Sequence, residues 1–168
     1  TNIASLIESA VANSKVIVHS NGPLSNEIRL SGYRSEENGG KRITYQIKSL
    51  SADYFSAFNI PLLAGANLTQ SQIDNDENRI VIDEGMAKAL FPELSYEEII
   101  GKTVALNREE GAVQPIINGI SRNTISRTGI TETLSFPAIY THRIESALLN
   151  FAVMMPQGQT ISAEMLED

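Results

Sequence analysis

Short runs of alternating hydrophobic and polar residues dominate the first part of the chain. Residues 28–32 and 43–47 each alternate between apolar and polar side chains, which is the period of a half-buried strand. The polar segment 35–40 separates these two runs and predicts a β-hairpin. Unbroken apolar triplets at 16–18 and 80–82 indicate buried strands. Further strands are predicted at residues 104–106, 113–120, 137–140 and 151–155.

Helical periodicity separates these strands. It predicts helices over the first dozen residues, 52–58, 84–90 and 96–100, with another beginning at Ser162. Ser51 and Asp83 stand where N-capping residues are expected. Residues 65–78 and 121–135 are polar and turn-rich, so surface connections are expected there. Hairpins combined with isolated helices favour an α+β fold over a doubly wound parallel sheet.

The length and charge of the chain narrow its possible roles. Its 168 residues suffice for one domain or for two small lobes. The formal net charge of -7 argues against a nucleic acid or an anionic membrane surface as the main partner. The sequence has no cysteine, which excludes disulfides and thiolate chemistry. It opens without Met or a signal peptide, and we expect it to be part of a larger protein.

Gly101-Lys102-Thr103 has the appearance of the end of a phosphate-binding loop. That motif requires a glycine five residues before the second glycine, where this chain has Tyr96. It also requires a strand followed by a helix, whereas here a predicted helix precedes and a predicted strand follows. The segment is therefore interpreted as a helix-terminating glycine that enters a strand.

Other candidate chemistry is incomplete. The acidic turn 74–78 begins like a calcium loop, but Arg79 and Gly85 occupy positions that demand Gly and Glu. His19 and His142 lie in different predicted strands and have no second ligand at a metal-like spacing. No nucleophile elbow is present. The sequence thus predicts no catalytic, cofactor-binding or metal site, and no enzyme.

Five sequence blocks occur in the order typical of one protein family. They are 51–65 (SADYFSAFNIPLLAG), 80–92 (IVIDEGMAKALFP), 99–104 (IIGKTV), 117–120 (INGI) and 137–140 (PAIY). Together they resemble the MacB-type periplasmic core domain of ABC-transporter permeases of the MacB and FtsX-like kind. Ala66, Leu68 and Asn118 depart from the family pattern, which puts the subfamily in doubt rather than the family.

The resemblance implies a two-lobed domain. Residues 1–78 and 141–168 would form a porter-like lobe of strands and helices, and residues 79–140 an inserted, sabre-like and mainly β lobe. In that topology the strand at 151–155 returns to pair with a strand from residues 15–50. An alternative is an extracytoplasmic small-molecule sensor domain of a membrane receptor.

The resemblance also implies a location and a role. Such a domain lies in the periplasm, between two transmembrane helices of an inner-membrane permease, and transmits ATP-driven motion to periplasmic substrates or partners in export. The implied partners are a cytoplasmic ABC ATPase domain or subunit reached through the membrane part, a second permease copy, and a periplasmic adaptor protein.

The segment Ser121–Ser135 is long for a connection within a compact domain. It carries Arg122 and Arg127 against Glu132, a local positive excess on an acidic protein. We therefore regard these three residues as a candidate contact for a partner. A mobile surface loop without a partner explains the same composition equally well.

Overall fold

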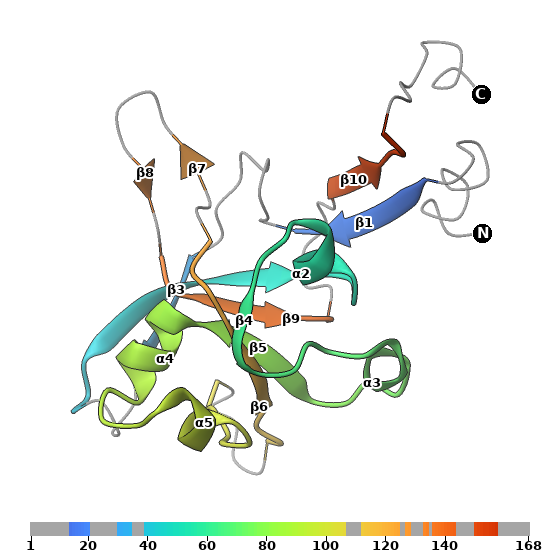
Figure 1. Cartoon of the computed structure of the whole chain (residues 1–168). Coiled ribbons are helices and arrows are strands. Elements are labelled where there is room, and N and C mark those ends of the chain that lie inside the picture. Colours follow the sequence, from blue (N-terminus) through green and yellow to red (C-terminus); the bar gives the residue numbers. More distant parts are fainter. Residues whose placement is uncertain are drawn as a thin grey trace.

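A mixed six-stranded sheet forms the centre of the molecule in the computed structural model (Figure 1). The structure describes residues 14–20, 30–34, 39–106, 112–124, 127–128, 133–134, 136–143 and 150–157. The sheet has the order β2 (Leu30–Arg34), β3 (Arg42–Ser49), β9 (Ala138–Thr141), β5 (Arg79–Asp83), β6 (Ile116–Ser121), β4 (Leu62–Gly65). Two further pairs join β1 (Lys15–His19) to β10 (Asn150–Met154), and β7 (Arg127–Thr128) to β8 (Thr133–Leu134).

Strand direction varies across the main sheet. β2 and β3 form the predicted antiparallel hairpin. β3 runs parallel to β9, and β5 runs parallel to β6, while β5 and β9 are antiparallel and β4 is antiparallel to β6. Such mixing of directions, with helices between some strands, confirms the predicted α+β class.

Four short helices are described: α2 (Tyr54–Ala57), α3 (Gln70–Asp74), α4 (Glu84–Leu90) and α5 (Tyr96–Ile99). The Asp83 side chain caps α4 as predicted, because its Oδ1 accepts a hydrogen bond from the Met86 amide. The expected cap of α2 was wrong: Asp53, not Ser51, is the N-cap residue and makes no side-chain capping bond. α3 was not predicted. Thr69 and Gln72 form a capping box that starts it within the expected surface connection.

The two faces of the sheet carry separate apolar clusters. Successive strand residues point to opposite faces, so Ile139 of β9 joins the cluster under α4 and α5, while Tyr140 joins the cluster under β1 and α2. Val81 and Ile82 of β5 divide in the same way. The sheet is therefore covered on both sides, and polar residues at alternate positions of its central strands are buried.

The predicted strand at 104–106 was wrong. An isolated bridge between Thr103 and Ile116 stands in its place. β6 pairs mainly with β5 and with β4. β4 was not predicted, because its four residues, 62–65, show no alternation of apolar and polar side chains in the sequence.

The returning strand was correctly predicted. β10 pairs with β1 in antiparallel register, across more than 130 residues of sequence. The main sheet, however, combines β2, β3 and β4 with β5, β6 and β9, which were assigned to different lobes. The division into lobes stays a prediction, and a boundary at 78/79 would separate strands that share one hydrogen-bonded sheet.

Gly65 lies where β4 ends against β6. Its φ of +67° is in the left-handed region, and a Cβ there would lie 2.3 Å from the carbonyl oxygen of Asn118. We expect Gly65→Ala to lower the free energy of unfolding by about 2 kcal/mol or more. Gly39 also has a positive φ, but a Cβ added there would meet nothing within 4 Å. Gly39→Ala therefore measures only the cost of placing alanine in the left-handed backbone conformation. Urea unfolding of both variants tests this: equal losses would contradict the close-approach argument.

Candidate functional site

The chain enters and leaves the described structure through one antiparallel ribbon, formed by β1 and β10. Lys15, the first residue of β1, lies opposite Met154, the last residue of β10, and His19 lies opposite Asn150. Antiparallel pairing therefore places the start of β1 beside the end of β10. Figure 1 shows this ribbon set apart from the six-stranded sheet.

Backbone hydrogen bonds join the inner end of the ribbon to the end of β3. The Ser20 amide donates to the Ser49 carbonyl over 2.8 Å, and the Ser51 amide donates to the Val18 carbonyl over 3.0 Å. Between them, His19 forms an isolated antiparallel bridge with Leu50. Backbone hydrogen bonds thus tie β1 to the end of β3 in the main sheet.

Side chains of α2 pack against this junction. The His19 ring lies 5.9 Å from the Tyr54 ring and 5.8 Å from the Phe58 ring, centroid to centroid, both with steep interplanar angles. Ile17 is fully buried in the same cluster. Burial, together with the charge of Lys48, lowers the pKa of His19, so the neutral ring is favoured in this apolar setting.

His19 lies in a strand, as predicted, and is buried in β1. Its Nδ1 has no hydrogen-bond partner among the described residues. The exposed ion pair between Lys15 and Asp53, at 2.9 Å, adds a contact of ribbon to α2. Exposed pairs of this kind contribute about 0–1 kcal/mol, so packing and backbone pairing hold the junction together.

The segment Ser121–Ser135 is more structured than predicted. Ser121 is buried in β6, and residues 127–128 pair with 133–134 as the β7–β8 hairpin. Arg122 is exposed and its amide donates to the Pro61 carbonyl over 3.0 Å. Arg127 is in β7, opposite Leu134, while Glu132 lies outside the described residues. Because Glu132 is outside the described residues, the structure does not show how the three candidate residues lie relative to one another.

The segment that leads into this hairpin is anchored to the sheet. The Thr124 hydroxyl accepts a hydrogen bond from Lys48 Nζ over 2.8 Å and lies 2.9 Å from the Tyr140 hydroxyl. One residue earlier, Asn123 Oδ1 accepts from the Gly85 amide over 2.9 Å. Residues 123 and 124, which precede the hairpin, are thus fixed to the sheet.

Lys48 and Asp83 are buried on the same face of the sheet. Burial lowers the pKa of Lys48 to about 8, opposed by the attraction of Asp83. Burial likewise raises the pKa of Asp83 to about 6, opposed by backbone hydrogen bonds and by Lys48. Sequence reasoning identified Asp83 as a helix cap but did not predict that Asp83 and Lys48 are buried on one face of the sheet. The alternation in β3 places Lys48 on its polar face, which in a sheet covered on one side would be exposed.

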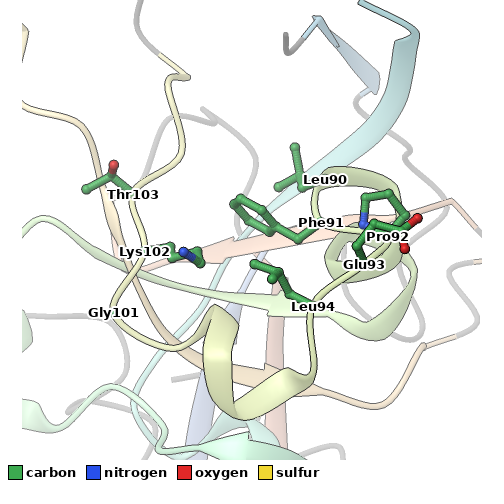
Figure 2. A pocket seen from close by; sticks show the side chains of 8 residues that line it. All are labelled: Leu90, Phe91, Pro92, Glu93, Leu94, Gly101, Lys102 and Thr103. Carbon is green, nitrogen blue, oxygen red and sulfur yellow. The ribbon is translucent and has the colours of Figure 1, made fainter. Parts of the chain in front are cut away.

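The Gly101-Lys102-Thr103 segment lines an open groove of about 640 Å³ together with residues 90–94 (Figure 2). α5 precedes the segment, and β6 is the next described element of secondary structure. The Gly101 amide donates to the Ile117 carbonyl, and the Lys102 amide to the Ile99 carbonyl. The amides of Gly101 and Lys102 are therefore used inside the fold and are not available as backbone donors for a phosphate group.

We therefore expect the chain to bind no ATP at this segment. Titration of a fluorescent ATP analogue at micromolar concentration should give no saturable signal, and Lys102→Ala should leave the titration unchanged. Saturable binding that Lys102→Ala abolishes would contradict this expectation.

Comparison with known proteins identifies the domain. The family model of the MacB-like periplasmic core domain matches residues 4–163. The chain belongs to this family. Membership makes the chain a periplasmic or extracellular domain of a MacB-like ABC-transporter permease. It confirms the resemblance seen in the sequence. It does not favour the alternative of a small-molecule sensor domain. It is a family of permease domains and not a catalytic family.

Solved structures share the fold of this MacB-like domain. The periplasmic region of MacB from Actinobacillus actinomycetemcomitans matches with a TM-score of 0.55 at 16% identity, over 95% of this chain and 82% of that one. The extracellular domain of the noncanonic ABC-type transporter YknZ from Gram-positive bacteria matches with a TM-score of 0.54 at 14% identity, over 82% of this chain and 58% of that one. A comparison with curated proteins gave no match.

The acidic turn of the MacB-like domain contacts the end of β9. His142 Nε2 lies 3.0 Å from Asp76 Oδ1, and Arg143 Nε donates to the same oxygen over 3.1 Å. These hydrogen bonds, that of His142 first, lower the pKa of Asp76. In the part of the chain that the structure describes, no three His, Asp or Glu side chains gather as metal ligands, and no helix has the length and apolarity of a membrane span.

Proposed function

We propose that this domain transmits ATP-driven motion of membrane helices to periplasmic substrates or partners during export. The observation that carries the proposal is the β1–β10 ribbon, through which both ends of the described chain reach the sheet. Adjacent entry and exit suit a domain inserted between two membrane helices, because both connections then start from one point.

The junction supports the proposal mechanically. A ribbon that transmits motion to the sheet must not bend at the junction between them. β1 is tied to β3 by backbone hydrogen bonds on both sides of His19. Tyr54 and Phe58 pack against the His19 ring at the same point. Cores packed in this way pass displacement on rather than absorb it.

The same proposal includes the partners and the membrane. We propose that the permease lies in the inner membrane, works with a cytoplasmic ABC ATPase domain or subunit, forms a dimer with a second copy, and meets a periplasmic adaptor protein. Family membership implies the ATPase and the dimer.

Flexible insertions test the transmission. Eight-residue Gly-Ser segments, placed between Ser14 and Lys15 and between Met155 and Pro156 of the full-length permease, would allow the helices to move without moving the ribbon. We expect ATP hydrolysis to persist and substrate export to fall at least tenfold. Both are measured on the permease with its ATPase in reconstituted vesicles or in cells.

The matched control inserts the same segment between Gly39 and Gly40, in the turn before β3. This turn is outside the path from the ribbon to the sheet, so export should remain within about twofold of the unmodified permease. Full export with both terminal insertions would overturn the proposal.

We further propose that the β7–β8 hairpin, with Arg122, Arg127 and Glu132, contacts a periplasmic partner or the second permease copy. The anchored segment before the hairpin supports this, because Lys48 and Tyr140 hold Thr124, three residues before Arg127, against the sheet. Replacing residues 125–135 by a short Gly-Ser turn keeps Thr124 and the anchored segment. The full-length transporter should then lose export while membrane insertion and dimer formation persist. Unchanged export would contradict this proposal and show that the hairpin serves only as a connection within the chain.

A further inference from the structure

Thr103 lies beside β6 and pairs with it through an isolated bridge to Ile116. Ile117 donates to the Lys102 carbonyl, and Val104 donates to the Pro115 carbonyl. These two bonds flank the Thr103–Ile116 bridge, which is therefore a non-hydrogen-bonded antiparallel pair. In such a pair the backbone N–H and C=O of the residue point away from the neighbouring strand. Among the described residues, neither group of Thr103 has a backbone hydrogen-bond partner.

The groove next to Thr103 has an apolar floor. Leu90 and Phe91 are buried beneath it, and Leu94 is half-buried. Figure 2 shows the Phe91 ring and the Leu94 side chain turned towards the segment 101–103. Glu93 and Lys102 are both exposed at the rim and carry opposite charges. The groove thus offers an unpaired backbone edge, an apolar surface and a charge of each sign.

We propose that this groove binds an extended peptide segment of a partner protein by strand addition. The peptide backbone pairs with the N–H and C=O of Thr103, which makes two hydrogen bonds. One bulky apolar side chain of the peptide lies on Phe91 and Leu94. Main-chain pairing supplies affinity in this mode of recognition, while the pocket for a side chain supplies specificity.

An extended peptide fits the groove better than other occupants. The groove is open along the edge, whereas small molecules are held in clefts that bury most of their surface. The charges of Glu93 and Lys102 complement a peptide that carries both signs, which fixes its direction. β4 occupies the other part of the same side of β6, so the incoming strand is confined to the neighbourhood of Thr103. The inference concerns the chain alone and does not depend on force transmission.

Selection of peptides tests the proposal. A displayed library of random twelve-residue peptides is selected on the 168-residue chain, and the enriched peptides are synthesised and titrated. Thr103→Pro removes the outward N–H and leaves the two inward hydrogen bonds in place, because Lys102 and Val104 make those. We expect Thr103→Pro to weaken binding at least tenfold. The matched variant Thr103→Val keeps the N–H and should bind within about threefold of the unmodified chain.

Two further measurements keep the test independent of how well Thr103→Pro folds. Leu94→Gln changes the half-buried wall of the groove and should weaken the same peptides about fivefold or more. N-methylation of the peptide residue that pairs with Thr103 should abolish binding to the unmodified chain, since it removes the peptide's own donor. The proposal is overturned if no peptide is enriched. It is also overturned if the enriched peptides tolerate Leu94→Gln and N-methylation at every position.

Discussion

Tyr54→Ala is expected to lower the free energy of unfolding by about 3–5 kcal/mol. Tyr54 is fully buried, and its ring is within 5.1–6.2 Å, centroid to centroid, of the rings of His19, Phe55, Phe58 and Tyr140. Removing the ring would leave a cavity where α2 and β1 meet the sheet. The loss is measured by urea unfolding followed by circular dichroism.

Tyr54→Phe is the matched control. The Tyr54 hydroxyl is buried, has no hydrogen-bond partner among the described residues, and has its pKa raised by burial. Removing an unpaired buried hydroxyl while the ring stays in place should cost less than about 1 kcal/mol, or should stabilise. If Tyr54→Phe costs as much as Tyr54→Ala, the hydroxyl makes an essential bond and the packing argument is wrong.

The second large effect is on the pH dependence of stability and comes from Asp83. The folded pKa of about 6 lies above the ordinary value of 3.8. Between these values the folded state binds more protons than the unfolded state, so stability falls as pH rises through this window. The contribution of Asp83 to the free energy of unfolding should therefore decrease by about 2–3 kcal/mol between pH 4 and pH 6.5.

Asp83→Asn isolates this contribution, because asparagine still caps α4 but does not titrate. The stability of the unmodified chain, minus that of Asp83→Asn, should fall by this amount over the same pH range, as measured by urea unfolding. The ¹³C shift of the Asp83 carboxyl should titrate near pH 6. Two parallel stability profiles, together with a carboxyl midpoint near 4, would show that Asp83 is solvated rather than buried.

Local sequence was enough to determine the elements whose stabilising contacts are local. The alternation in residues 28–32 and 43–47 predicted the β2–β3 hairpin, and Asp83 was recognised as the cap of α4. Tyr96, where the motif requires a glycine, argued against a phosphate-binding loop, and in the structure the amides of Gly101 and Lys102 bond inside the fold. The hairpin joins strands that are neighbours in the sequence, and the cap of α4 depends on residues three positions apart.

Contacts between distant segments were decided by the tertiary structure. Asn118 departs from the family pattern. In the structure its Nδ2 donates to the Ala66 and Asn67 carbonyls, and its Oδ1 accepts from Arg79. β4 is thereby joined to β6 and β5. No spacing in the sequence marks these partners, which are 39 to 52 residues away.

The candidate sites depend on the same kind of contact. The polar face of β3 looks solvent-exposed in the sequence, yet Lys48 is buried because β1, α2 and the segment at Thr124 cover that face. The backbone groups of Thr103 point away from β6 because the hydrogen bonds of its neighbours fix that orientation, and they have no backbone partner among the described residues. Periodicity reports which side of a strand a residue occupies, whereas the elements packed on that side decide whether the residue meets water, a partner or the core.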